Sequence, residues 1–328
     1  MVGKYEIEIY NNKSHYFLTV KRNITVIQGN SGTGKTSLLQ MISQYDDFGA
    51  SSGITVLSDA DCHVVSGRSW EEQIKRYQDS IIFIDEMNSF VKTDEFARIV
   101  KASGNYFVIV SRDGLPNLPY SIEEIYGLKT ASNTGKYKAF SKVYNEMYHI
   151  YHLEGMKYSG LEAVIIEDSN AGYEFFYSVF GEKCISAHGK SNVYSKFVES
   201  DGAVLAIVDG AAFGSEIGNV MRYIESNKKD CVIYAPESFE YLILCAGLFD
   251  IPKDVLEKTY DHADSAEYMS WEQFYTKYLT DVTKGTVYQY SKGNLNKSYL
   301  TKGTVDRILE VLPEMVRECG ERHMHGRK

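Results

Sequence analysis

A glycine-rich run near the amino terminus combines residue types and spacing that suit a bound phosphate chain. The run consists of Gly29, Asn30, Ser31, Gly32, Thr33, Gly34, Lys35, Thr36 and Ser37. Glycines let such a loop fold with its backbone N–H groups pointing at a polyphosphate, and the positive end of a following helix adds to that field. We expect Lys35 to reach the β and γ phosphates and the hydroxyl of Thr36 to hold Mg²⁺. The loop therefore predicts a site for a nucleoside triphosphate.

The residues on either side of the loop favour this interpretation over a glycine turn that only joins two elements. An apolar strand is predicted over residues 24–28, and an amphipathic helix follows the loop. A strand, then the loop, then a helix is the context that a phosphate loop requires. ATP is the expected nucleotide because of its abundance in cells.

An apolar strand that ends in two acids supplies the second part of such a site. The strand is predicted over residues 81–85, so that Asp85 ends it and Glu86 follows. We expect Asp85 to bind Mg²⁺ through water and Glu86 to polarise the attacking water. Arg112 follows another apolar run and is interpreted either as a sensor of the γ phosphate or as a loop residue paired with Asp113. Lys35 and Glu86 are thus the catalytic candidates of this site.

These motifs together resemble P-loop ATPases of the additional-strand catalytic Glu group, over roughly residues 1–150. The resemblance implies a parallel sheet flanked by helices and the hydrolysis of ATP. Transporter-type and chromosome-maintenance ATPases are disfavoured, because no segment like Leu-Ser-Gly-Gly-Gln lies between the loop and Asp85. A phosphotransferase that acts on a small acceptor is an alternative, although Glu86 favours water as the acceptor.

A second pair of acids follows two later apolar strands. Glu167 ends a strand predicted over residues 163–167, and Asp209 ends one predicted over 203–209. The carboxyl ends of neighbouring parallel strands share one edge of the sheet, so we expect these carboxylates to converge on Mg²⁺. The turn at residues 189–192 follows the strand between them in sequence and could face the same crevice.

This order of acids and turns resembles the Toprim domain of topoisomerases, primases and overcoming-lysogenization-defect nucleases. The resemblance implies that Glu167 acts as general acid or base and that Asp209 binds the metal used in phosphodiester cleavage. Ala211 stands where the family has a second Asp, so one carboxylate of the usual metal cluster is missing. Glu216 is assigned to the metal site in its place. The other acids that could contribute are Glu237 and Asp168.

The predicted elements divide the chain into three parts and place it in the α/β class. Residues 1–155 are expected to form a P-loop ATPase domain, a parallel sheet with an edge hairpin. Residues 156–250 are expected to form a smaller, Toprim-like parallel α/β domain. Residues 251–328 are expected to form a mostly helical extension packed on the second domain. Strands alternate with helices in the first two parts, which indicates parallel sheets, whereas residues 137–154 fit neither pattern clearly.

Composition limits the partners and the compartment. The formal net charge is −9, so the surface as a whole does not attract nucleic acid, and any such contact must be local. The five cysteines include no Cys-x-x-Cys pair, which favours reduced thiols over a disulfide framework or a zinc site. No leader or membrane-spanning stretch is evident, and we expect a cytoplasmic protein with no membrane partner.

The combination of the two modules resembles ATPase-nucleases of the overcoming-lysogenization-defect family. The resemblance implies a protein that hydrolyses ATP and whose nucleotide state controls a Mg²⁺-dependent nuclease acting on DNA or RNA. It also implies a role in antiviral defence, as a homo-oligomer or with a partner protein. The alternative is a nucleotide-dependent regulatory switch whose degenerate Toprim-like domain binds a partner.

Overall fold

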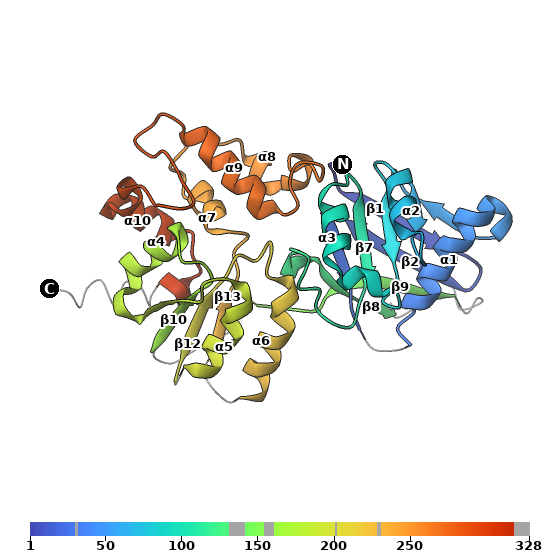
Figure 1. The fold of residues 1–328 in the computed structure, drawn as a ribbon, viewed down its shortest axis with the longest axis horizontal. Helices are drawn as coiled ribbons and strands as arrows, with labels where there is room; N and C mark the ends of the chain where they lie inside the picture. Colours follow the sequence, from blue (N-terminus) through green and yellow to red (C-terminus); the bar gives the residue numbers. More distant parts are fainter. Residues whose placement is uncertain (30–31, 131–141, 154–160, 201, 228–230, 318–328) are drawn as a thin grey trace. The chain divides into compact units, whose positions relative to one another are not determined.

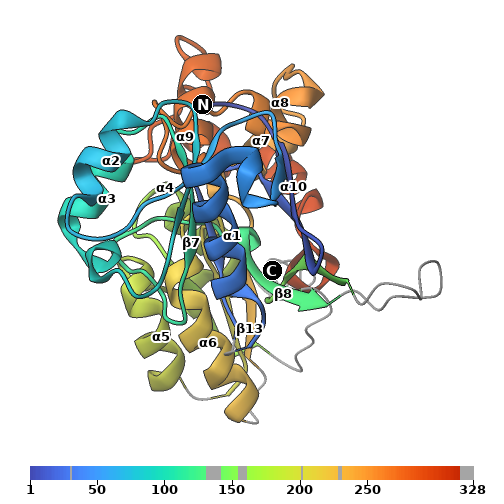
Figure 2. The same ribbon diagram turned by 90° about the vertical axis from the view of Figure 1, so that its right-hand side faces the viewer.

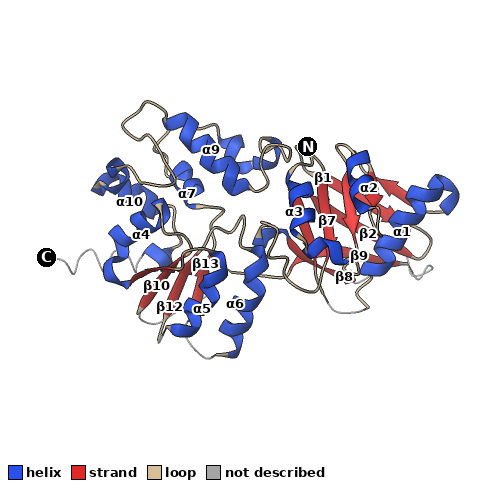
Figure 3. Cartoon of the chain, in the orientation of Figure 1, coloured by secondary structure: helices blue, strands red, loops and turns tan. Residues whose placement is uncertain are grey.

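The chain forms two compact α/β units, each built on its own sheet (Figure 1, Figure 3). The computed structural model describes residues 1–29, 32–130, 142–153, 161–200, 202–227 and 231–317. The first unit comprises Met1–His152 and Lys258–Ser270, and the second comprises Leu153–Glu257 and Trp271–Lys328. The α/β class predicted from the sequence is therefore confirmed.

The sheet of the first unit is mixed, with a parallel block next to an antiparallel one. Its described strands are β1 (Tyr5–Tyr10), β2 (Ser14–Val20), β3 (Ile24–Ile27), β4 (Thr55–Leu57), β5 (Cys62–Val64), β6 (Ile81–Ile84), β7 (Tyr106–Val110), β8 (Ile125–Thr130) and β9 (Val143–His149). Their order across the sheet is β4-β1-β2-β9-β8-β3-β7-β6-β5. Strands β8, β3, β7, β6 and β5 run parallel to one another, whereas β1 pairs antiparallel with β2 and β4, and β9 pairs antiparallel with β8.

The sequence predicted a parallel sheet with a hairpin at its edge, and this prediction was only partly right. The hairpin forms as expected, with Tyr10 opposite His15, but β4 pairs with β1 on its outer side, so the hairpin is not the edge. Alternating apolar residues indicate that a segment forms a strand but do not specify its neighbour. Strand β9 lies within residues 137–154, which fitted neither pattern. Its buried residue is the polar Asn145, so the strand shows no alternation of buried apolar residues.

Three helices of the first unit accompany the parallel block: α1 (Lys35–Phe48), α2 (Trp70–Arg76) and α3 (Asp94–Lys101). Helix α1 buries Leu38, Leu39, Met41 and Ile42 in the core that the sheet and the hairpin share. Helix α3 begins at a side-chain cap, in which the Thr93 hydroxyl accepts the backbone N–H of Phe96 at 3.2 Å. The packing of its apolar residues holds α1 in place directly after the glycine-rich loop.

The sheet of the second unit is fully parallel, as predicted. Its strands are β10 (Ala163–Ile166), β11 (Cys184–Ser186), β12 (Val204–Ile207) and β13 (Cys231–Tyr234), in the order β11-β10-β12-β13. The connecting helices are α4 (Ala171–Phe180), α5 (Lys190–Glu199), α6 (Gly214–Ser226) and α7 (Phe239–Cys245). Helices α5 and α6 lie side by side (Figure 2), and Tyr194 contacts Tyr223 between them.

The remaining chain differs from the expected helical extension in two ways. It contains α8 (Lys253–Glu257), α9 (Trp271–Thr283) and α10 (Lys302–Glu310), but residues 284–296 are not helical. Packed tyrosine rings hold that stretch instead, with Tyr299 in contact with Tyr288 and Tyr290. In addition, residues 258–270 belong to the first unit rather than to the second. None of the described helices has the length and apolar character needed to cross a membrane.

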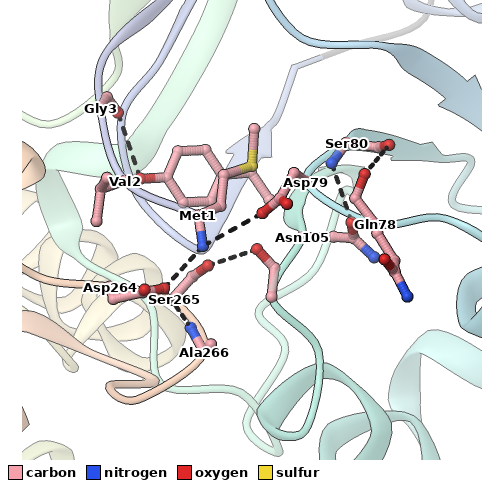
Figure 4. A network of polar contacts seen from close by, with 12 residues as sticks. Met1, Val2, Gly3, Gln78, Asp79, Ser80, Asn105, Asp264, Ser265 and Ala266 are labelled. Atoms are coloured by element: carbon pink, nitrogen blue, oxygen red, sulfur yellow. Dashed lines mark hydrogen bonds and ion pairs between the residues drawn. The ribbon is translucent and has the colours of Figure 1, made fainter.

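The 258–270 segment is attached to the first unit by hydrogen bonds near the starts of β1, β3 and β7. Figure 4 shows the part of this network around Met1, Asp264 and Ser265. The buried amide of Asn23, next to β3, donates to the carbonyls of Ser265 at 3.2 Å and Tyr268 at 2.9 Å. The Ser265 hydroxyl donates to the carbonyl of Gly104, just before β7, at 2.6 Å. The α-amino group of Met1 lies 2.7 Å from Asp264 and holds the pKa of that carboxyl below its usual range. The segment therefore completes the polar contacts at the amino-terminal ends of β3 and β7.

Candidate functional site

The glycine-rich loop connects β3 to α1 in the context that the sequence predicts. Gly34 precedes the helix with a φ of 89°, a conformation that side chains rarely adopt. A Cβ atom at this position would lie 2.9 Å from the hydroxyl of Tyr16, which donates to the carbonyl of Gly34 at 3.0 Å. Glycine is required here both by the backbone and by the closeness of the hairpin. Asn30 and Ser31, which the sequence also assigns to nucleotide binding, lie outside the described residues.

The amino-terminal end of α1 suits an anion. Gly34 offers no side chain to cap the helix, and the first turn carries no acid. The first N–H groups of a helix have no partner within the helix, and its dipole places positive potential at this end. A phosphate at this end would accept hydrogen bonds from these N–H groups and would be attracted by the positive potential.

A single pocket of about 240 Å³ brings the loop together with the acids that follow β6 and the arginine that follows β7. The residues that line it are Gly32, Thr33, Gly34, Lys35, Thr36, Ser37, Leu39, Asp85, Glu86, Val110 and Arg112. Strand β7 pairs with both β3 and β6, which places the three strand ends next to one another. The structure therefore gathers the described residues that the sequence assigns to the first site, and Gly29 joins them through its contact with Lys35.

The ammonium group of Lys35 is held within the loop. Its Nζ donates to the carbonyl of Gly29 at 2.6 Å and to the hydroxyl of Thr33 at 3.0 Å. Burial lowers the pKa of Lys35, and Arg112 lowers it further, whereas Glu86 raises it. Glu86 and Arg112 therefore both act electrostatically on Lys35.

Glu86 is paired with Arg112 across the pocket. The Nε atom of Arg112 lies 3.0 Å from Oε1 of Glu86, whereas Asp113 pairs with Lys92 at 3.0 Å. Of the two interpretations of Arg112, the pairing with Asp113 is therefore not the one observed.

Two oxygen donors in the pocket fit a magnesium ion. Thr36 is exposed at the first turn of α1, and Asp85 stands at the tip of β6, where its Oδ1 accepts the N–H of Met87 at 3.2 Å. Mg²⁺ usually takes few protein ligands and completes its shell with phosphate oxygens and water. The donor set therefore suits Mg²⁺ bound together with a polyphosphate.

In the second unit, Glu167 and Asp209 meet at the carboxyl ends of the adjacent strands β10 and β12. The backbone N–H of Asp209 donates to Oε2 of Glu167 at 2.9 Å. The N–H of Phe239, at the start of α7, donates to Oδ1 of Asp209 at 3.2 Å. The next residue is Gly210. Glycine is required at this position because a Cβ atom there would lie 2.6 Å from the carbonyl oxygen of Ala235. The two acids are therefore neighbours at this edge of the sheet, and their binding of Mg²⁺ stays a prediction.

The two acids line a small cavity of about 20 Å³. Its lining comprises Ile166, Glu167, Asp168, Gly172, Phe176, Ile207, Val208, Asp209, Pro236, Phe239 and Leu242. A space of roughly this size holds about one water molecule. The turn at 189–192 also lies at this edge, since the N–H of Gly189 donates to the carbonyl of Glu167 at 2.7 Å.

The other acids considered from the sequence have different partners. Asp168 caps α4 by accepting the N–H groups of Gly172 at 3.3 Å and Tyr173 at 2.9 Å. Glu216 accepts the hydroxyl of Ser215 at 3.2 Å and is not in the lining of the cavity. Across the residues that the structure describes, no group of three or more Asp, Glu, His or Cys side chains is arranged to hold a metal ion. Glu167 and Asp209 carry the type of ligand that Mg²⁺ prefers. Glu216, which was expected to supply the third carboxylate, does not line the cavity with them.

The structure adds four charged or polar residues that sequence reasoning missed, and all come from outside the β10–β13 strands. Lys292 forms ion pairs with Glu272 and, at 4.0 Å, with Glu240. The hydroxyl of Tyr290 donates to Glu240 at 2.7 Å. Glu240 is only 1% exposed, and an acid among the apolar residues of α7 was the one signal in the sequence. Lys292 and Tyr290 lie in a stretch with no periodic pattern.

Burial dominates the electrostatics of this acidic cluster. It raises the pKa of Glu167 to about 7, and the nearby Glu272 adds to the rise. Burial also raises the pKa of Asp209, and Glu272, Glu167 and Glu240 add to this. Burial alone would lower the pKa of Lys292, but Glu240 and Glu272 outweigh it and raise that pKa. Burial and the neighbouring acids therefore both favour the protonated forms of Glu167 and Asp209.

Comparisons with known proteins complete the description of these sites. No family model matches the chain, and no curated protein matches it. The assignment of a function therefore rests on the geometry and chemistry of the two sites.

Proposed function

We propose that the first unit binds and hydrolyses ATP, and that its nucleotide state controls a Toprim-like, Mg²⁺-dependent nuclease in the second unit. The observation that carries the first half is the single pocket shared by the glycine-rich loop, Asp85, Glu86 and Arg112. The place of β7 between β3 and β6 supports it, because it brings the loop, the two acids and Arg112 to one edge of the sheet. The paired acids Glu167 and Asp209 support the second half.

The residues of the first pocket have separate tasks in this mechanism. The N–H groups at the start of α1 and the ammonium of Lys35 bind the phosphates. Glu86 accepts a proton from water while the water oxygen bonds to the γ phosphorus and the bond to the β–γ bridging oxygen breaks, which releases ADP. Mg²⁺, held by Thr36 and Asp85, would neutralise charge on the phosphate oxygens.

Variants of Lys35 and Glu86 test the ATPase. We expect Lys35→Ala to lower the affinity of the full chain for ATP, measured by calorimetry, by at least about tenfold. Glu86→Gln should keep ATP binding but lower the hydrolysis rate roughly 10²- to 10⁴-fold. Lys101→Ala, which changes an exposed lysine at the end of α3, is the matched control. Unchanged ATP affinity in Lys35→Ala would refute the nucleotide site.

In the second unit, Glu167 is the proposed general acid or base and Asp209 the proposed metal ligand. We expect Glu167→Gln and Asp209→Asn to abolish Mg²⁺- or Mn²⁺-dependent nicking of a supercoiled plasmid while ATP binding survives, because each removes one buried carboxylate from the cluster. Glu225→Gln changes an exposed acid on α6 and serves as the control. Nicking that persists in both site variants would exclude these residues as the nuclease centre.

One observation favours a second candidate, a regulatory switch whose second unit binds a partner without cutting. Ala211 stands at the position of the missing carboxylate, and the described residues contain no cluster of three metal-ligating side chains. A calorimetric titration of the full chain with Mn²⁺ separates the two candidates. Heat that disappears in Asp209→Asn but not in Asp85→Asn supports the nuclease, and no heat from the second site supports the switch.

A further inference from the structure

The loop that follows α9 carries a lysine into the acidic cluster of the second unit. Lys292 forms an ion pair with Glu272 on α9, and its Nζ lies 4.0 Å from Oε1 of Glu240 on α7. Its backbone carbonyl accepts the N–H of Ala171, the first residue of α4, at 3.2 Å. The lysine is therefore held at its backbone by the start of α4 and at its ammonium group by two acids.

The charge of Lys292 reaches the acids that line the small cavity. The start of α4, which holds the backbone of Lys292, is also the end that Asp168 caps, and Asp168 lines the cavity. Helix α7, which carries Glu240, begins at the N–H that donates to Asp209. Burial raises the pKa of both aspartates, and Lys292 opposes that rise. The lysine therefore stabilises negative charge on acids that it does not contact directly.

The ammonium group stays charged without being enclosed. Burial alone would lower the pKa of Lys292, but Glu240 and Glu272 outweigh it and raise that pKa. The side chain of Lys292 is 37% exposed, whereas that of Glu240 is 2% exposed. Buried carboxylates are costly without a positive charge nearby. A lysine on a flexible four-carbon stem can supply that charge and still turn toward water when another cation is present.

We propose that Lys292 is the internal counter-cation of this acidic cluster, and that a divalent cation at Glu167 and Asp209 binds against its charge. Without metal, the ammonium group offsets part of the negative charge of the acids. Once Mg²⁺ is bound, the ammonium group is repelled and turns toward solvent. The affinity for the metal is therefore set by this lysine as well as by the ligands. This inference rests on the proposed metal site of the second unit and adds to it a residue that regulates its occupancy.

The test measures Mn²⁺ binding to the full chain by calorimetry without nucleotide, in an Asp85→Asn background that removes a proposed ligand of the first site. We expect Lys292→Met to raise the affinity for Mn²⁺ about tenfold, because an uncharged side chain of similar length does not repel the metal. Lys292→Arg keeps the charge and should keep the original affinity. Lys277→Met removes an exposed lysine of α9 that pairs with Asp281, and this matched control should also leave the affinity unchanged.

Stabilisation by Mn²⁺ is a second readout, which a merely structural ion pair would not change. Without metal, Lys292→Met should melt at a lower temperature than the parent chain, because its acids lack their counter-cation. Mn²⁺ should then raise its melting temperature by more than it raises that of the parent, since the variant binds the metal more tightly. If the variant folds only with Mn²⁺, and not with Na⁺ at the same ionic strength, that result also supports the inference. A variant that Mn²⁺ does not stabilise would overturn it.

The outcomes separate this inference from the proposed nuclease. Heat that Asp209→Asn abolishes is assigned to the second site. If that site binds Mn²⁺ in the parent chain and Lys292→Met binds it no more tightly, the metal site stands and the inference is refuted. If Mn²⁺ binds only after Lys292→Met, the inference stands and the regulatory switch replaces the nuclease. If neither chain binds Mn²⁺ there, both the nuclease and the inference fail.

Discussion

Tyr16 connects the phosphate loop to the antiparallel part of the first sheet. Its hydroxyl donates to the carbonyl of Gly34, and its side chain is 1% exposed in the core. A residue of β2 thereby fixes the last residue of the loop before the helix begins. The geometry of the proposed nucleotide pocket depends on this contact as well as on the loop itself.

We expect Gly34→Ala to lower the affinity for ATP by at least about tenfold. A non-glycine residue at a left-handed φ costs roughly 1–2 kcal/mol, and the new Cβ would meet the hydroxyl of Tyr16. Calorimetry with ATP and a thermal melt of the full chain measure the two effects. Tyr16→Phe removes the obstructing hydroxyl, so the double variant should regain only the part of the loss that is due to crowding. Affinity equal to that of the unaltered chain in Gly34→Ala would show that the loop does not bind phosphate in this conformation.

Residues within a continuous motif were predictable, and residues brought in by tertiary contacts were not. The loop, Asp85 and Glu86 follow from fixed spacing next to apolar strands, and the pocket gathers them. Lys292 reaches the acids of the second unit from a loop far along the chain, and no local pattern marks it. The prediction for Glu216 was wrong for the same reason. Its position after the third strand suggested a metal ligand, but Glu216 does not line the cavity.

At the scale of elements, the 258–270 segment holds the amino-terminal ends of β3 and β7 through hydrogen bonds that centre on the buried Ser265. These two strands lead into the phosphate loop and to Arg112 at their other ends. The amide of Asn23 is the main attachment, with two carbonyl acceptors on the segment. Loosening this attachment should release the segment before it disturbs the pocket.

We expect Asn23→Ala to lower the free energy of unfolding by about 1–3 kcal/mol, because one buried and one partly buried carbonyl lose their donor. Limited proteolysis should also cut within residues 258–270 faster. Asn117→Ala is a matched control, since its amide likewise donates to two carbonyls, those of Val91 and Thr93, but does not contact the segment. Equal cleavage of residues 258–270 in both variants would contradict the role of this attachment.

Periodicity predicted the positions of most elements but not their neighbours. In the second unit the expected alternation of strands and helices matches the structure closely, because each strand is apolar and each helix has one buried stripe. In the first unit β4 pairs with β1 rather than with the parallel block. Strand β5 was missed, since it has only three residues and begins at Cys62. Pairing and short strands depend on partners distant in sequence.

At the scale of the whole molecule, neither unit is a continuous stretch of sequence. The chain passes between the units three times, after His152, Glu257 and Ser270. The expected boundary near residue 155 lies close to the first passage. The second and third passages have no marker in composition, because a segment that returns to an earlier unit is indicated only by its contacts.

We expect a polypeptide of residues 1–152 alone to melt at a lower temperature than one in which residues 258–270 follow residue 152 through a flexible Gly/Ser linker. The shorter form lacks the acceptors for Asn23 and the hydroxyl that binds Gly104. The linker itself costs little, because closure entropy grows slowly with length. Thermal melts monitored by circular dichroism measure the difference. Equal midpoints would mean that the segment contributes nothing to the first unit.

The return of residues 258–270 to the first unit also sets the order in which the protein can mature on the ribosome. Domains usually fold in turn as they emerge from the exit tunnel. Here the first unit receives its final piece only after residue 270 has been translated, when most of the second unit has already been synthesised. A ribosome that stops before that point therefore releases a chain in which neither unit is complete, because the Trp271–Lys328 part of the second unit is translated later still.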